Sequence, residues 1–462
     1  MNIKQMKWTM FTIVAIGNFI AMLDASSVTL ALYPMATDLH VSMGQIQWVM
    51  VAYMLVLTVF LPFFGKLGDI FSKNKLYSLG FAIFAIGAFL NIISTSFNML
   101  VICRCIEAIG ASIMLSNAQA LIATIFKGKK RGKALGLNGC LIAIGGISGP
   151  ALGGILIHNC GWHSIFYPSM IVGFLGIVYA RNFLPHNKVK NFKSFKFDYK
   201  GFIYFTISLF ALLLAISEGH EWGWSSINII LLGIVSLTFG GLFYFRDHKI
   251  NYPLINFSLF KIKPFTFGNL AVLMSYMAMF TNSILLPFFL QDIQKHNALV
   301  TGLLILPYSL TLSVMAPIAG RLSGKYGSRY LTLAGPSVYC VALIMFTLFG
   351  KDAPMWQIIF ASGIMGIGNG LFQSPSNNAI MTSVNKSELG IASGILALSR
   401  NMGNILGVAV TITLFESFNK IFINGGKNYE ISFLYAYKTT MCFGILFGLA
   451  CLIFAYTAYK EL

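Results

Sequence analysis

The sequence predicts an all-α polytopic membrane protein, and three observations carry this prediction. Of the 462 residues, 57% are hydrophobic, only 10% are charged, and the apolar residues gather into long stretches. Soluble domains carry about 25% charged residues, so a chain of this length with so few charges cannot cover its surface for water. The composition therefore excludes a soluble enzyme and favours a protein with many membrane spans of roughly 20 apolar residues each.

Fourteen apolar stretches follow one another along the chain, and each is long enough to cross a bilayer. They run approximately over 8–32, 46–64, 76–95, 99–125, 134–158, 165–184, 201–217, 227–245, 264–290, 299–320, 330–349, 355–383, 389–416 and 434–458. The first stretch is too long for the core of a cleaved secretory signal. We therefore interpret it as the first spanning helix, which gives fourteen transmembrane helices.

The segments between the stretches differ in their content of basic residues. If the N-terminus is cytoplasmic, 25 of the 32 Lys and Arg residues lie in inner segments and four lie in outer segments. Cytoplasmic loops carry an excess of Lys and Arg, so this distribution predicts that both termini are cytoplasmic. The basic residues of these cytoplasmic loops also explain the net charge of +18. The charge therefore does not indicate nucleic-acid binding, and we expect no nucleic-acid partner.

An internal repeat relates the two ends of the chain. The segment 62–69 recurs at 317–324, an offset of 255 residues, and five glycines recur at an offset of 258. The pattern predicts an N-terminal six-helix half at 1–185, two inserted helices with basic cytoplasmic loops at 186–263, and a C-terminal six-helix half at 264–462. Parallel halves with a substrate site between them near the bilayer midplane are typical of secondary transporters.

Motifs for catalysis, metal binding or ATP hydrolysis do not occur in the sequence. The seven cysteines form no CxxC pair, and the chain has no Walker A string, HExxH motif or nucleophile elbow. We expect no catalytic residue, no metal and no cofactor, and we expect a monomer. The remaining source of energy for transport is an ion gradient.

Three charged residues stand well inside predicted spans of the N-terminal half, where charges are costly and usually functional. Asp24 in the first span is a candidate to release a proton when cargo arrives and to recover it when cargo leaves. A structural Asp satisfied by neighbouring hydroxyls is the alternative. Arg104 and Glu107 lie three residues apart on one face of the fourth span and can pair. Glu107 is either a second titrating or cation-binding carboxylate or a static partner of Arg104.

Polar residues at helical spacing in the C-terminal half are candidates for a substrate cavity. Asn369, Gln373 and Asn377 lie four residues apart on one face of the twelfth span, and Arg400 follows in the thirteenth. Tyr276 in the ninth span offers aromatic surface. Together with Asp24 and Glu107, these residues form the predicted cavity lining. Hydrogen bonding between helices explains the polar spacing equally well.

Two motifs resemble those of the major facilitator superfamily and, within it, the fourteen-helix drug:proton antiporters. The fifth span matches the antiporter motif of that superfamily, with its characteristic residues at Gly145, Gly149, Pro150, Gly153 and Gly154. Small residues at such spacing allow close helix contact. The loop from Gly65 through Asp69 to Lys73 is similar to the cytoplasmic gating loop of the superfamily, although Ile70 stands where a basic residue is usual.

The resemblance implies the major facilitator fold and a proton-coupled multidrug efflux antiporter. It further implies that Arg104 takes part in proton transfer, with Asp24 and Glu107 as the candidate proton-coupling carboxylates, although Glu107 stands where glutamine is common in the family. It also implies that Asp69 helps to latch the cytoplasmic side, and that the protein is a multi-pass protein of a bacterial plasma membrane. We expect small amphiphilic, cationic or zwitterionic drugs, protons and membrane lipid as its partners. Two alternatives are an antiporter for one physiological cargo (a metabolite, lipid or alkali cation) and a non-transporting membrane sensor.

Overall fold

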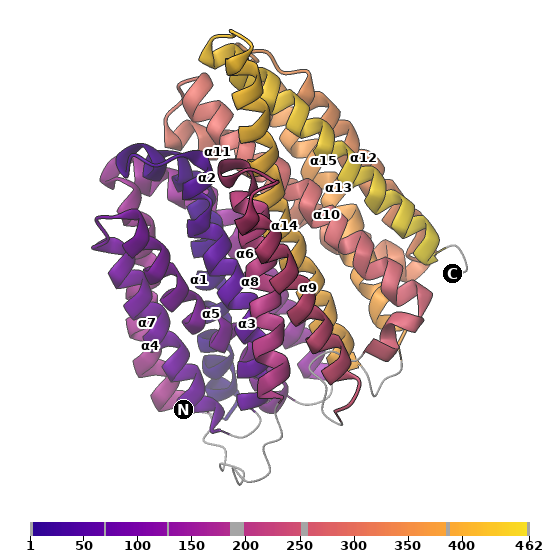
Figure 1. The fold of residues 1–462 in the computed structure, drawn as a ribbon. Helices are drawn as coiled ribbons and strands as arrows, with labels where there is room; N and C mark the ends of the chain where they lie inside the picture. Colours follow the sequence, from indigo (N-terminus) through magenta and orange to yellow (C-terminus); the bar gives the residue numbers. More distant parts are fainter. Residues whose placement is uncertain are drawn as a thin grey trace. The chain divides into compact units, whose positions relative to one another are not determined.

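The computed structural model describes residues 3–68, 71–126, 129–184, 198–250, 257–384 and 389–459. Within this part of the chain the regular structure is helical (Figure 1). Fourteen helices of 17 residues or more correspond one to one with the fourteen predicted spans. Within the described residues, thirteen of them are long and apolar enough, by length and composition, to cross a membrane. The prediction of an all-helical polytopic fold is confirmed.

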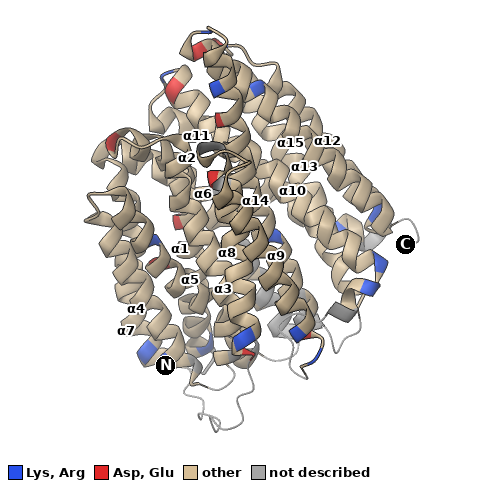
Figure 2. Ribbon diagram, in the orientation of Figure 1, with Lys and Arg blue, Asp and Glu red and all other residues tan. Residues whose placement is uncertain are grey.

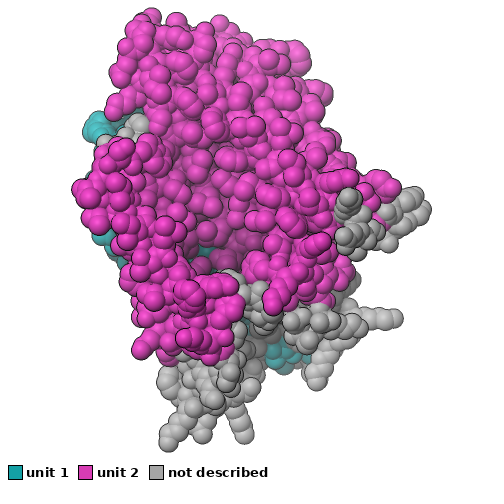
Figure 3. Space-filling view, turned by 45° about the vertical axis from the view of Figure 1, so that its right-hand side comes forward, with its two compact units in different colours: residues 1–197 teal, residues 198–462 magenta. Residues whose placement is uncertain are grey.

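The contacts divide the chain into two compact units, residues 1–197 and 198–462 (Figure 3). The elements of the first unit are α1 (Ile3–Asp38), α2 (Met43–Ile46), α3 (Trp48–Leu67), α4 (Lys73–Ile92), α5 (Phe97–Ile125), α6 (Lys129–Cys160), the 3₁₀ helix η1 (Trp162–Phe166) and α7 (Tyr167–Phe183). Its core includes Phe81, Phe84 and Met114, which are fully buried or nearly so.

The second unit contains the remaining helices. They are α8 (Tyr199–Trp222), α9 (Ile227–Asp247), η3 (Phe257–Lys261), α10 (Lys263–Phe288), the π-helical turn η4 (Phe289–Ile293), α11 (Ala298–Tyr326), α12 (Arg329–Thr347), α13 (Met355–Thr382), α14 (Leu389–Asn424) and α15 (Tyr429–Tyr459). Helices α8 and α9 pack against each other, and α8 packs on α14. There the Thr413 hydroxyl donates a hydrogen bond to the Ile216 carbonyl at 2.9 Å. The three-part division predicted from the sequence stays a prediction.

The two units repeat one packing plan. In the first unit α1 packs on α6, α5 packs on both α3 and α4, and α4 packs on α7. In the second unit α10 packs on α14, α13 packs on both α11 and α12, and α12 packs on α15. The glycines that recur in the sequence occupy equivalent contacts: Gly110 lies against the backbone of Phe84, and Gly368 lies against the backbone of Tyr339. The structure thus supports the internal repeat at the level of individual contacts.

Most charged residues of the described part of the chain lie near the ends of helices (Figure 2). This placement is expected for helices that cross a bilayer, because a charge in the hydrocarbon is costly. The charges that lie well inside helices are therefore the ones that need a functional or structural explanation.

Candidate functional site

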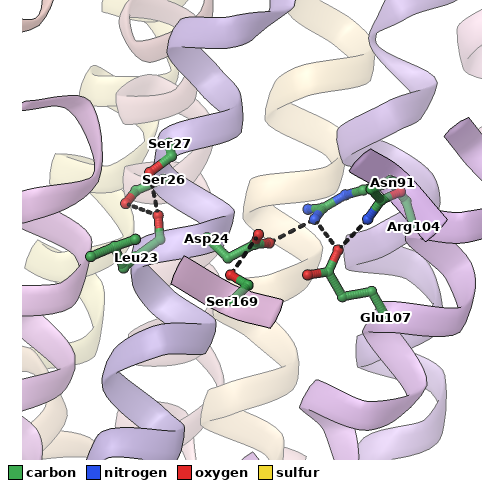
Figure 4. A network of polar contacts seen from close by, with 8 residues as sticks. All are labelled: Leu23, Asp24, Ser26, Ser27, Asn91, Arg104, Glu107 and Ser169. Carbon is green, nitrogen blue, oxygen red and sulfur yellow. Dashed lines mark hydrogen bonds and ion pairs between the residues drawn. The ribbon is translucent and has the colours of Figure 1, made fainter. Parts of the chain in front are cut away.

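Asp24, Arg104 and Glu107 form one buried ionic cluster inside the first unit (Figure 4). The Arg104 Nη1 atom lies 2.6 Å from Asp24 Oδ2 and 2.6 Å from Glu107 Oε2. All three side chains are at most 1% exposed. The structure therefore brings together the three charged residues predicted from the sequence, and it joins α1 to α5 across 80 residues of chain.

Neutral groups from three other helices complete the surroundings of this cluster. The Ser169 hydroxyl on α7 donates to Asp24 Oδ1 at 3.2 Å, and the Asn91 amide on α4 donates to Glu107 Oε2 at 2.7 Å. The ring of Tyr53 on α3 lies 4.0 Å from the Arg104 guanidinium carbon. A cation over an aromatic face is attracted by the ring quadrupole. Sequence analysis missed these three residues, because Ser, Asn and Tyr are ordinary residues in membrane helices.

The charges of the cluster do not balance when both carboxylates are ionised. Two carboxylates face one guanidinium, which leaves one net negative charge in a site without water access. Burying an uncompensated charge is strongly unfavourable. Within the described residues, Glu107 Oε1 and Arg104 Nε are also buried without a hydrogen-bond partner. One bound proton would make the cluster neutral, so its composition suits the exchange of a single proton.

Close helix packing fixes the position of Glu107. A Cβ atom on Gly87 of α4 would lie 2.5 Å from the Glu107 Cα atom. Glycine is therefore required at this point for α4 to approach α5.

A glycine turn leads to the aromatic residue that packs on Arg104. Gly161, between α6 and η1, has a φ of +75°, a conformation that glycine adopts readily. This turn leads the chain into η1, where Phe166 packs 5.6 Å from the Arg104 guanidinium carbon.

The predicted antiporter motif lies on α6 and packs directly against α1, the helix that carries Asp24. The Ser27 hydroxyl donates to the Gly149 carbonyl at 3.1 Å, and a Cβ on Gly153 would lie 3.2 Å from the Ser27 Cβ. Gly154 is buried, and Pro150 lies inside the helix. The small residues of the motif thus allow the α1–α6 contact that positions Asp24.

We expect an added methyl group to lower the free energy of unfolding at Gly145 but not at the neighbouring Gly146. In Gly145→Ala the new Cβ would lie 2.5 Å from the Phe19 carbonyl oxygen, whereas a Cβ at Gly146 meets nothing within 4 Å. Overpacking of this kind costs about 1–3 kcal/mol. Gly145→Ala should lower the free energy of unfolding by that amount, and Gly146→Ala should leave it unchanged or slightly higher. Denaturant unfolding of the purified protein in detergent measures both, and equal stability of the two variants would contradict the packing argument.

The predicted gating loop is described only in part. Gly65 lies near the end of α3, and Lys73 is the first residue of α4. Asp69 lies outside the described residues. The latch therefore stays a prediction.

The predicted cavity residues of the second unit form two hydrogen-bonded pairs. The Gln373 amide on α13 donates to the Tyr276 phenol on α10 at 3.2 Å, and the Asn369 amide donates to the Tyr308 phenol on α11 at 3.4 Å. The side chain of Asn377, on the same helix as both amides, forms no hydrogen bond within the described residues. These two hydrogen bonds join different helices, which is the alternative that the sequence left open. The role of these residues as a cavity lining stays a prediction.

The repeat shows that each unit carries its own kind of polar group. The contacts of Gly145 with Phe19 and Met22 recur between Gly403 and its partners Leu273 and Tyr276. The sequence offsets of the repeat and these glycine contacts place Ala278, Ser362 and Met365 where the first unit has its ionic cluster. The offset of 255 residues places Tyr308 where the first unit has Tyr53. A tyrosine that recurs at the repeat offset is a sequence signal that would have identified both residues as candidates for the site. The ionic cluster is therefore not a general requirement of this packing plan.

Comparison with known proteins agrees with this architecture. The chain matches the model of the Major Facilitator Superfamily over residues 14–247 and 268–461. It is 34% identical over 442 residues to the riboflavin transporter RibZ of Clostridioides difficile, with 95% of each chain covered. It is 28% identical over 396 residues to the multidrug resistance protein Stp of Mycobacterium tuberculosis, covering 86% of this chain and 73% of Stp.

Solved structures show the same fold. A bacterial homologue of the human lysosomal transporter Spinster, in an inward-facing and unoccupied conformation, superposes with a TM-score of 0.73 at 14% identity, covering 98% of this chain and 97% of that one. The resemblance seen in the sequence motifs is confirmed. The chain belongs to the major facilitator superfamily and is a multi-pass membrane transporter, not an enzyme.

Proposed function

We propose that this protein is a proton-coupled antiporter of the plasma membrane that exports amphiphilic cationic or zwitterionic compounds by alternating access. The observation that carries the proposal is the buried cluster of two carboxylates and one guanidinium. The glycine-rich motif on α6, which resembles that of antiporters, and the relatives named for multidrug resistance support it.

The cluster suits proton exchange because its charge changes with access to water. With one proton bound, the site is neutral and remains stable away from water. Opening toward water on the side with fewer protons releases the proton, since hydration then stabilises the second carboxylate. The negative site favours a cationic group of the cargo until a proton replaces it. If the site can be closed off from water only when it holds either a proton or cargo, the transporter exchanges protons for cargo.

An assay of proton–cargo exchange in proteoliposomes tests the proposal directly. Purified protein is reconstituted with a pH-sensitive dye inside the vesicles, and ethidium or a zwitterionic fluoroquinolone is added outside. We expect cargo uptake to be accompanied by a pH change of the lumen that requires the protein. Cargo movement without any protein-dependent pH change would contradict proton coupling, and a pH gradient that drives no cargo would contradict export of these compounds.

A second candidate is transport of one planar metabolite, with drugs incidental. The similarity to RibZ, at 34% identity over 95% of each chain, favours riboflavin or a related heteroaromatic compound. The amides and phenols of Asn369, Gln373, Tyr276 and Tyr308 offer neutral hydrogen-bonding groups of the kind such a cargo needs. Riboflavin in the same vesicle assay separates the candidates: saturable uptake of riboflavin with none of the drugs would favour the second.

A further inference from the structure

Arg400 is a cationic side chain within a spanning helix of the second unit, and it has no anionic partner in the part of the chain that the structure describes. It is half-buried on α14, and within the described residues no carboxylate lies within 4.0 Å of it. Glu416 on the same helix is sixteen residues away, about 24 Å at 1.5 Å per residue. Charged residues in membrane helices usually pair with each other or line a ligand pathway. Arg400 does not pair within the described part of the chain.

Asn404 lies one helical turn beyond Arg400 and therefore on the same face of α14. Its Oδ1 atom is buried and has no hydrogen-bond partner among the described residues. An unpaired buried amide oxygen is unfavourable unless something supplies a donor. Arg400 thus places hydrogen-bond donors next to the Asn404 acceptor, which is unpaired among the described residues.

Tyr276 adds a third polar group at the same level of the unit. Gly403, between Arg400 and Asn404 in sequence, would place a Cβ 2.8 Å from the Tyr276 Cβ, so α14 packs closely on α10 at this point. The phenol oxygen accepts from Gln373 at 3.2 Å. Its own hydroxyl hydrogen has no acceptor within the described residues and remains available as a donor.

The first unit shows that helix packing does not require these side chains. The equivalent positions are Met22 for Tyr276, Ile142 for Arg400 and Gly146 for Asn404. A Cβ on Gly146 meets nothing within 4 Å, so the first unit has open space at the position equivalent to Asn404. The same packing plan thus forms without a guanidinium, an amide or a phenol at these places.

We propose that Arg400, Asn404 and Tyr276 form a cargo subsite for a planar group rich in carbonyl or carboxylate oxygens. The proposal rests on the transport function proposed above and specifies which cargoes bind tightly. The guanidinium presents donors in a planar fork that matches paired oxygen acceptors. Asn404 Oδ1 accepts an N–H that lies between two carbonyls, as in a cyclic imide. Zwitterions with a carboxylate and neutral imides are therefore preferred over cations that lack acceptors.

Binding to the full-length protein in lipid nanodiscs, followed by fluorescence, tests the subsite. Riboflavin supplies an imide edge, a zwitterionic fluoroquinolone supplies a carboxylate, and ethidium is a planar cation with neither. Arg400→Gln should weaken binding of riboflavin and of the quinolone by about 10- to 100-fold, because hydrogen bonds to charged groups are among the stronger ones. Ethidium binding should change by less than about twofold. Arg321→Gln, at an exposed position on α11, is the matched control and should change none of the three.

Asn404→Ala distinguishes the two kinds of acceptor. It should weaken riboflavin but not the quinolone, because a carboxylate has no N–H for Oδ1 to accept. Should Arg400→Gln not give folded protein, Arg400→Lys and Tyr276→Phe carry the test. Each should selectively weaken the probes that carry acceptors, since Lys lacks the fork and Phe lacks the hydroxyl.

Three results overturn the subsite. The first is an equal loss of all three probes in Arg400→Gln, which indicates a structural role, and the second is unchanged affinity for both acceptor-bearing probes. The third is an unaltered protein that binds ethidium but neither of the others. The proposed function fails differently: the binding pattern persists in the unaltered protein, but no protein-dependent pH change accompanies cargo movement.

Discussion

Asp24→Asn should abolish the coupling between the proton gradient and cargo accumulation. With a neutral amide at position 24, Arg104 and Glu107 form a balanced pair, and the cluster no longer changes charge when cargo moves. For electroneutral exchange of one proton per cargo molecule, a gradient of one pH unit supports about tenfold accumulation, since a tenfold ratio corresponds to about 1.4 kcal/mol. The variant should bring cargo only to equal concentrations on both sides. Cargo distribution in proteoliposomes at an imposed pH gradient measures this directly.

Asp38→Asn is the matched control for this experiment. Asp38 ends the same helix, is exposed, and accepts a hydrogen bond from Trp162 Nε1 at 2.8 Å, a role that an asparagine oxygen can keep. Asp38→Asn should accumulate cargo like the unaltered protein.

Glu107→Gln decides whether Glu107 titrates or only pairs with Arg104. Loss of coupling would assign the exchanged proton to both acids together, and retained coupling would leave Glu107 as a static partner. Unchanged accumulation in Asp24→Asn would remove Asp24 from the mechanism.

The sequence was sufficient for the fold because a membrane simplifies the problem. A span must be long and apolar, so fourteen stretches located fourteen helices, with ends that differ by a few residues. The glycine repeat also carried information on packing. Gly110 and Gly368 recur because each allows two backbones to approach closely, and the structure shows those contacts. Helix ends were less certain, since helices such as α1 and α14 extend well beyond the apolar stretch.

The candidate site was predictable only where a residue is unusual for its surroundings. Asp24, Arg104 and Glu107 stood out as charges in apolar stretches, and the spacing of Arg104 and Glu107 predicted their pairing. Nothing local in the sequence indicated that Asp24 would meet Arg104, because that contact depends on how α1 packs on α5. Asn91 and Ser169 escaped for a similar reason: a polar neutral residue in a membrane helix is common, and only its position identifies its partner.

Arg104→Met should cause the largest loss of stability among single changes in the cluster. The substitution leaves Asp24 and Glu107 buried together without the guanidinium that bonds both at 2.6 Å. Removing one partner of a buried ionic group typically costs about 3–5 kcal/mol. The free energy of unfolding should fall by that amount in denaturant titrations of the purified protein in detergent, or the variant should fail to accumulate in the membrane.

The triple variant Asp24→Asn, Arg104→Met, Glu107→Gln separates loss of the guanidinium from loss of charge balance. Replacing a whole buried ionic group by neutral side chains of similar volume is often neutral or stabilising. The triple variant should therefore regain most of the stability lost in Arg104→Met, while proton-coupled accumulation stays absent. If it remained as unstable as Arg104→Met, the arginine would stabilise the fold by packing against Tyr53 and Phe166 rather than by balancing charge. Recovery of stability without recovery of coupling means that the cluster is kept for proton exchange and not for the fold.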